Sequence, residues 1–270
     1  MSAELLKQKG YKWLPRSQKR KYSRAERDVR LCFAKAAVRL SKKALREKLA
    51  MSMDGVVLSM PPINETDRFN YCWGGFSHMW RKSNEANTPV LAGANGYDKQ
   101  VPLARAIPLW AGVSSDGFQA VLWHSKKKTD HEEWSNVVRV GKLTEAIRQL
   151  NPMRRSGPWT VPCDNETFLR HKSSMRAYAA KNVQMWGVPP RSPDLNPIEM
   201  FWSWVRRELR LRDLADMKNK RAPLGKSAYT LRLKTLLRGK RAQEVAGHCA
   251  RKFRSTCLEV MKNKGAAAGN

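Results

Sequence analysis

The most informative stretch of this sequence is Pro190-Arg191-Ser192-Pro193-Asp194-Leu195-Asn196-Pro197-Ile198-Glu199. Asn196-Pro197 is typical of a helix start, and the sequence that follows predicts a helix to about residue 212. Glu199 then lies in the first helical turn, where a carboxylate caps the helix end and meets its positive dipole. Pro193-Asp194 is typical of a turn, so we interpret Asp194 as structural rather than as a metal ligand. Capping alone therefore explains Glu199, unless other acidic residues converge on it.

Two further acidic residues stand out because apolar runs lead into them. Asp54 lies inside the run 51–58, and Asp164 directly follows the predicted strand 159–163 and precedes Asn165. Each has an ordinary explanation, since Asp54-Gly55 is also typical of a hairpin turn and Asp164-Asn165 of a strand-to-helix turn. Carboxylates at strand ends and on a facing helix can, however, hold two divalent ions roughly 4 Å apart. Such ions prefer oxygen ligands and promote in-line displacement at a phosphodiester.

The periodicity of apolar residues predicts an α/β domain around these acids. Helical patterns cover residues 23–49, 130–150, 169–181 and 197–212, Ser23 is the expected N-cap of the first, and residues 213–270 read as mostly helical. Apolar runs of strand length cover residues 51–60, 76–81, 104–113, 118–123, 159–163 and 183–186. Strands that first cluster and then alternate with helices indicate a mixed sheet with helices packed on it.

The charge of the chain is concentrated at its two ends. Its 270 residues contain 52 Lys and Arg against 23 Asp and Glu, a net charge of +29. Residues 1–50 carry +12 and residues 201–270 carry +13, whereas residues 51–200 carry +4. Phosphate neutralisation requires Lys and Arg, and a folded core does not. We therefore prefer a nucleic-acid partner to a basic surface that serves solubility alone.

Two classes of protein are disfavoured by the sequence. The chain has no run of 18 apolar residues, and Lys7, Lys9 and Lys12 interrupt its N-terminus, so we expect neither a membrane protein nor a secreted one. Its five cysteines are widely spread and form no C-x-x-C pair, which indicates free thiols in a reducing compartment.

The stretch ending at Glu199, followed by Phe201-Trp202, resembles the signature of the mariner superfamily of DNA transposases. That family carries a similar S-P-D-L-N-P-I-E stretch before a Trp-containing helix, and its Glu is the third catalytic acid. Cys163-Asp164-Asn165 resembles the family's second acid, and the 34 residues between Asp164 and Glu199 are a spacing that the family uses. Shorter matches, at residues 79–82 and 110–117, help to extend the resemblance over roughly residues 20–212.

The resemblance implies an RNase H-like (retroviral integrase-type) α/β fold, with a mixed sheet of about five strands flanked by helices and basic helical extensions. The expected organisation is a basic helical segment over 1–48, a catalytic domain over 49–212 and a basic helical extension over 213–270. It also implies that Asp54, Asp164 and Glu199 are the catalytic acids and that they bind two Mg²⁺ or Mn²⁺ ions.

The sequence departs from the family at the first acid. The family often has Asp-Glu there, whereas this chain has Asp54-Gly55, and Glu65 or Asp67 is a rival for the same role. We prefer Asp54 because an apolar strand leads into it, as a ligand carried by a sheet requires. Asn165 and His171 are expected to support the metal ligands from behind, although His171 lies two residues further along than is usual.

The function that the resemblance implies is that of a DDE transposase catalytic domain in cut-and-paste transposition. A metal-activated water would free DNA ends, and the exposed 3′-hydroxyl would attack target DNA, usually at a TA dinucleotide. The expected partner is double-stranded DNA, both transposon ends and target, bound by a homodimer, in the nucleus of a eukaryote or otherwise in a cytoplasm that holds the DNA. Basic residues of 7–48 and 206–254 would contact phosphates, among them Lys19, Arg20, Lys21, Arg24, Arg206, Arg207 and Arg210.

Two alternatives remain open from the sequence. Such enzymes normally begin with two helix-turn-helix modules, whereas here a basic segment resembling the end of that region precedes the catalytic part. The chain would then be a fragment, or a decayed or domesticated copy that binds DNA without cutting it. A basic RNA-binding protein without catalysis is the other alternative, and it predicts no dependence on divalent ions.

Overall fold

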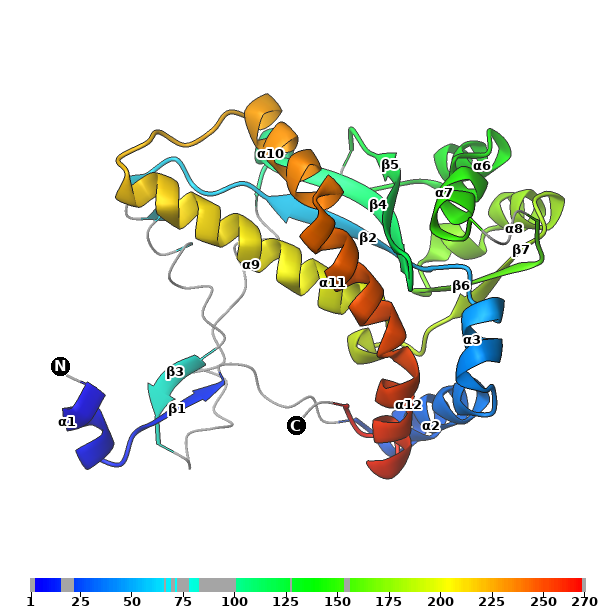
Figure 1. The fold of residues 1–270 in the computed structure, drawn as a ribbon, viewed down its shortest axis with the longest axis horizontal. Coiled ribbons are helices and arrows are strands. Elements are labelled where there is room, and N and C mark those ends of the chain that lie inside the picture. The colour runs from blue at the N-terminus through cyan, green and yellow to red at the C-terminus, as the bar shows by residue number, and fades with distance from the viewer. Residues whose placement is uncertain are drawn as a thin grey trace.

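The computed structural model describes residues 3–15, 22–65, 67–68, 71, 78–82, 101–126, 128–152 and 156–268. Its centre is a five-stranded mixed sheet with helices packed on both faces (Figure 1). Strands β2 (Ser52–Ser59), β4 (Ala106–Ser114) and β5 (Gly117–Trp123) pair antiparallel, and β6 (Trp159–Cys163) and β7 (Val183–Gly187) continue the sheet in parallel. The order across the sheet is β5-β4-β2-β6-β7, so the strand that carries Asp54 is central. The mixed sheet of about five strands is thus confirmed.

The C-terminal helices cover one face of this sheet. They are α9 (Pro197–Lys218), α10 (Lys226–Arg238) and α11 (Lys240–Arg251). Val56 and Leu58 of β2 pack here with Phe201 and Trp202 of α9 in one buried cluster. α9 continues past residue 212, where we expected it to end, to Lys218. The predicted domain boundaries therefore stay a prediction.

The opposite face is covered by α6 (His131–Arg139), α7 (Lys142–Leu150) and α8 (Lys172–Ala180), which the 3-10 turn η4 (Thr167–Arg170) precedes. The helix predicted over 130–150 is two helices, because Gly141 between them has a φ of +88° that ends the first. Met51 and Met53 of β2 pack into this second cluster. Since successive strand residues alternate between faces, Asp54 points the other way, toward α9.

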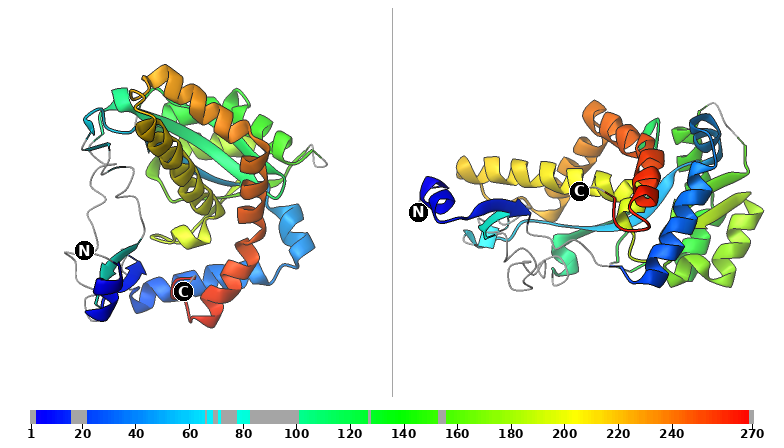
Figure 2. Two further views of the ribbon diagram at one scale, coloured as in Figure 1. Left: turned by 60° about the vertical axis from the view of Figure 1, so that its left-hand side comes forward. Right: turned by 90° about the horizontal axis from the view of Figure 1, so that it is seen from below.

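Helices from the N-terminal and C-terminal parts of the chain pack together beside the sheet. The helix predicted over 23–49 is also divided, into α2 (Arg24–Val38) and α3 (Lys42–Lys48), because Ser41 caps a new helix. The prediction that Ser23 is the N-cap of the first helix is confirmed, and its side chain forms a reciprocal capping box with Glu26. Helix α12 (Phe253–Lys262) packs against α2, so the two basic ends of the chain meet (Figure 2).

A second, two-stranded sheet lies apart from the central one. Strand β1 (Lys12–Pro15) pairs antiparallel with β3 (His78–Arg81), after the short helix α1 (Ala3–Gln8). The strand predicted over 76–81 therefore exists, but it does not join the central sheet (Figure 1). Two short 3-10 turns, η3 (Leu103–Arg105) and η5 (Pro193–Leu195), introduce β4 and α9. Among the described residues, no helix is long and apolar enough to span a membrane.

Candidate active site

Strand register brings the first two acids together. β2 and β6 are parallel neighbours in which Met53 pairs with Cys163, and Asp54 and Asp164 each come one residue later. The two carboxylates therefore start from adjacent positions and leave the sheet on the same face. Asp54 is the third residue of an eight-residue strand, so the alternative hairpin turn at Asp54-Gly55 is wrong.

The start of α9 brings the third acid over the same place. Glu199 lies in the first turn of α9, and Asn196 just before that turn is 99% buried against β2. The Ser52 hydroxyl donates to Asn196 Oδ1 over 2.7 Å, and Asn196 Nδ2 donates to the Met53 carbonyl over 3.4 Å. The Asn196 side chain does not cap α9, contrary to the capping that we expected at the Asn196-Pro197 step. The Asn196 side chain instead forms hydrogen bonds that connect the start of α9 to β2.

Asp54 is the most deeply buried of the three acids. Burial raises its pKa well above the ordinary value, and the negative charges of Glu199 and Asp164 raise it further. The backbone N–H of Gly55 donates a hydrogen bond that acts in the opposite direction, but it does not compensate. The carboxyl group of Asp54 thus lies where an added positive charge would be strongly favourable.

Asp164 and Glu199 lie nearer the surface. Asp164 keeps an exposed edge, and its partial desolvation raises its pKa, while a hydrogen bond with the Asn196 side chain lowers it. Glu199 is half-buried, and its pKa is raised by burial and by Asp164 in spite of Arg206 nearby. The sequence-predicted acids are therefore close enough to repel one another.

A fourth carboxylate, Glu166, belongs to the same group, and the sequence reasoning missed it. Partial burial and the charge of Asp164 raise its pKa, and Glu166 in turn raises the pKa of Asp54. The local spacing was the available signal, because in extended backbone the residue two positions after Asp164 returns to the same side. Glu166 also lines a groove of about 540 Å³ beside Gly55 and Trp110.

Trp110 explains why glycine follows the first acid. The indole ring lies against the Gly55 backbone, and a Cβ at that position would be 2.6 Å from ring atoms Cε2 and Cζ2. The ring is held by a 2.9 Å hydrogen bond from its Nε1 to Thr129 Oγ1. A glutamate side chain at position 55 has no room while Trp110 keeps this place.

The rival first acids occupy a different environment. Glu65 and Asp67 are both exposed, and the backbone N–H of Asp67 donates to Asn64 Oδ1 over 3.1 Å in a local turn. The acid whose pKa responds to Asp164 and Glu199 is Asp54. The geometry therefore favours Asp54 over both rivals.

The two residues that we expected behind the ligands have separate structural roles. Asn165 Nδ2 donates to the Val188 carbonyl over 2.5 Å, which ties the loop after β6 to the end of β7. His171 is the N-cap of α8: its Nδ1 accepts from the Ser173 N–H, and its ring stacks on that of His131 at 3.7 Å between centroids. This is a different role from the expected support of the acids, so we withdraw His171 from the site.

The predicted DNA-binding residues are dispersed. Lys19, Arg20 and Lys21 lie outside the described residues, and Arg24 is exposed at the start of α2. Arg206 lies near enough to Glu199 to lower its pKa, and Arg207 is exposed on the same helix. The Arg210 guanidinium packs over the Tyr71 ring at 5.2 Å from its centroid, so it points into the protein and is not a free phosphate contact.

The donor set suits a hard divalent cation. Within the described residues, no three His, Cys, Asp or Glu side chains already form a cluster that could hold a metal ion. The acids are thus within electrostatic range of one another without being closed around one point. Carboxylate oxygens are nevertheless the ligands that Mg²⁺ and Mn²⁺ prefer, and the raised pKa values show negative charge that a cation would neutralise.

Sequence comparison assigns the chain to a family. A family model described as "DDE superfamily endonuclease" matches residues 81–220, about half of the chain. The chain belongs to the DDE superfamily of endonucleases. The matched range contains Asp164 and Glu199 and begins after Asp54. A comparison with curated proteins finds no match.

Solved structures show that this DDE fold is shared with mariner transposases. The catalytic domain of Mos1 mariner transposase matches with a TM-score of 0.61 and 11% identity, over 95% of this chain and 100% of that one. A pre-cleavage Mos1 transpososome matches with a TM-score of 0.60 and 11% identity, over 96% of this chain and 67% of that one. The Mos1 catalytic domain with Raltegravir and Mn matches at 0.60 and 9% identity, over 93% and 100%. The predicted RNase H-like fold is confirmed.

Proposed function

We propose that this DDE endonuclease is a transposase catalytic domain that cuts DNA and joins the freed 3′ end to target DNA. The observation that carries the proposal is the convergence of Asp54, Asp164 and Glu199 from two adjacent parallel strands and the start of a facing helix. Structural relatives support it, because a Mos1 structure is described as a strand transfer complex.

The three acids would hold two Mg²⁺ or Mn²⁺ ions. When bound, these ions lower the pKa of the attacking water or 3′-hydroxyl and neutralise charge that develops on the phosphate. Asp54 supplies the buried carboxylate, and Asp164 and Glu199 supply carboxylates that reach solvent and hence DNA. Arg206 lies beside Glu199, where it could contact a phosphate of the bound strand. Mos1 structures with Mn and with Mg support this choice of ions.

The partners would be the transposon ends and a target duplex, bound by a homodimer. The net charge of +29 supports phosphate contacts, and exposed Arg24 and Arg207 are suitable residues. One Mos1 relative is described as a paired-end complex with left transposon end. Action in the nucleus, if the host is a eukaryote, belongs to the same proposal.

A plasmid assay tests the function. The purified chain is incubated with supercoiled and pre-nicked DNA in EDTA, Mg²⁺ or Mn²⁺, and nicked and joined products are separated on a gel. We expect products that require the metal ion and disappear in Asp164→Asn. Asp67→Asn is the matched control, because it makes the same change at the rival acid in an exposed turn.

Two outcomes would contradict this proposal. DNA binding without cleavage under all three conditions would favour the decayed or domesticated copy. If Asp67→Asn abolishes cleavage and a separate Asp54→Asn variant does not, the first catalytic acid is Asp67 and not Asp54.

A further inference from the structure

One side chain connects all three segments that carry the acids. Asn196 accepts from the hydroxyl of Ser52 and donates to the carbonyl of Met53, and its side chain is near enough to Asp164 to lower the pKa of that carboxyl group. Ser52 and Met53 immediately precede Asp54 in β2, and Asn196 itself lies three residues before Glu199. It is therefore in contact with the first segment, with the second acid itself, and with the start of the helix that carries the third.

The chemistry of the amide fixes how these contacts are divided. The Ser52 hydroxyl donates to Oδ1 and Nδ2 donates to the Met53 carbonyl, so the second N–H of Nδ2 is left for the neighbouring Asp164 carboxylate. The Asn196 residue is 99% buried, which leaves the amide with no water to exchange for these partners. Its orientation is thus determined by the protein alone.

The place of Asn196 in the helix is a second, independent observation. It occupies the N-cap position of α9, where an asparagine side chain normally accepts a hydrogen bond from the first helical turn. No such bond is made, and the side chain reaches across to β2 and Asp164 instead. The capping role is replaced by contacts with the site.

We propose that Asn196 is a positioning residue for the metal ligands, which holds Asp164 and the first turn of α9 against β2 so that the three acids face one another. This inference rests on the proposed function, because it assigns a role within the same site. Residues that orient ligands from behind typically change metal affinity by about 10- to 100-fold when they are replaced.

The test is Asn196→Leu, which preserves approximate volume and removes every hydrogen bond of the amide without adding charge. Mn²⁺ binding is measured by isothermal titration calorimetry, and the Mn²⁺ concentration for half-maximal plasmid nicking is measured in parallel. We expect the dissociation constant of Mn²⁺ and the half-maximal Mn²⁺ concentration each to rise by about 10-fold or more. Asn151→Leu is the matched control, since Asn151 Nδ2 also donates to two carbonyls, those of Ala50 and Ile147, at the end of α7.

The outcomes separate this inference from the proposed function. Wild-type Mn²⁺ affinity in Asn196→Leu, or an equal loss in Asn151→Leu, would overturn the positioning role and leave the function standing. If the Asp164→Asn variant binds Mn²⁺ as tightly as the wild-type protein, the proposed function is overturned, and the inference with it. If Asn196→Leu does not fold, Ser52→Ala decides. It removes only the hydroxyl that orients the amide, and we expect it to weaken Mn²⁺ binding by a few-fold, so that unchanged binding would overturn the role.

Discussion

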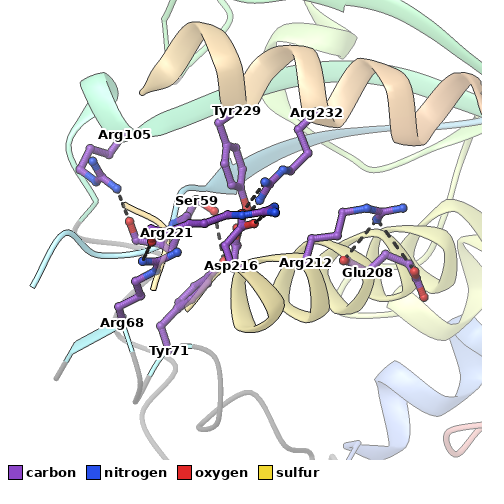
Figure 3. Close-up of polar contacts among 12 residues, drawn as sticks. Ser59, Arg68, Tyr71, Arg105, Glu208, Arg212, Asp216, Arg221, Tyr229 and Arg232 are labelled. Carbon is purple, nitrogen blue, oxygen red and sulfur yellow. Dashed lines mark hydrogen bonds and ion pairs between the residues drawn. The ribbon is translucent and has the colours of Figure 1, made fainter. Parts of the chain in front are cut away.

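The two ends of helix α9 hold carboxylates in opposite electrostatic situations. At the N-terminal end, burial raises the pKa values of Asp54, Asp164 and Glu199, and the charges of neighbouring carboxylates raise those of Asp54 and Glu199 further. At the C-terminal end, Asp213 and Asp216 are buried. Figure 3 shows Asp216 beside Arg221, Arg232 and Tyr229. One helix thus has carboxylates that face other carboxylates at one end and carboxylates paired with arginines at the other.

The C-terminal end of α9 is a dense polar network. Arg232 reaches Asp213 at 2.9 Å and Asp216 at 2.5 Å, and Tyr229 donates to Asp213 over 2.9 Å. Arg221 lies 3.4 Å from Asp216, and its carbonyl accepts from Arg68 Nη1 over 2.8 Å. These contacts join α9, α10 and the segment after β2 (Figure 3).

The difference separates structural carboxylates from functional ones. A buried carboxylate that the chain itself surrounds with guanidinium groups has its partners already, and removing it mainly costs stability. Buried carboxylates that repel one another cost stability as they stand, and they are retained where a cation or substrate from outside supplies the missing charge. The following predictions test this contrast, from the largest expected effect to the smallest.

Glu199→Gln should lower the rate of metal-dependent nicking by about 10³-fold, because the loss of a charged ligand removes several kcal/mol of transition-state stabilisation. The midpoint of urea unfolding without metal should not fall. Glu208→Gln is the control, since Glu208 lies on the same helix and pairs with Arg207 and Arg212 at 3.6 and 3.9 Å. Equal losses in the two variants would mean that α9 tolerates no change and would remove Glu199 from the site.

Asp213→Ala should have the reverse pattern, with a large loss of stability and little change in nicking. It removes the hydrogen-bond acceptor of Tyr229 and leaves Arg232 with Asp216 as its one remaining carboxylate partner among the described residues, and we expect the free energy of unfolding to fall by about 3 kcal/mol. Nicking per folded molecule should stay within a few-fold of wild type. Urea unfolding and a nicking assay at low temperature measure the two quantities, and a stable variant that cannot nick DNA would contradict the contrast between the two ends.

The pH dependence of stability gives a smaller effect with a defined sign. Burial raises the pKa of Asp213 from its ordinary value of 3.8 to about 6, against the hydrogen bond from Tyr229 and the charge of Arg232. Between pH 4 and 6 the folded protein therefore keeps a proton that the unfolded chain releases, and the free energy of unfolding falls as the pH rises. We expect a contribution of about 2 kcal/mol across this range. Asp213→Asn should flatten the decline measured by urea unfolding, and an unchanged slope would exclude Asp213 as its source.

Local patterns in the sequence were sufficient to predict much of the fold. The apolar runs predicted as strands in the central sheet are β2, β4, β5, β6 and β7, because their short length and the turn residues at their ends distinguish such runs from helices. Asp164 could be placed because its strand ends at Cys163, and Glu199 because Asn196-Pro197 starts a helix. These inferences needed no knowledge of what lies opposite.

Contacts between distant segments could not be predicted in this way. Arg30 appears in the sequence as part of a basic helix, yet it is fully buried and pairs with Asp194, 164 residues away, at 2.6 Å. Asn196 was predicted only as part of a helix start, although the hydrogen-bond partners of its amide lie on β2. A charged or polar side chain has several ways to be satisfied, and tertiary packing decides among them.

Asp54→Asn should stabilise the metal-free protein, which is the opposite of what Asp213→Ala does. The raised pKa of Asp54 means that its ionised form is disfavoured in the folded state, so at pH 7 a neutral amide removes a penalty. The amide oxygen of the variant can still accept the Gly55 N–H, so we expect the free energy of unfolding without metal to rise. Mn²⁺ should raise the melting temperature of wild type and not that of the variant, as differential scanning fluorimetry would show. If Asp54→Asn is less stable than wild type without metal, then Asp54 is a structural carboxylate like Asp213, and the contrast between the two ends of α9 does not hold.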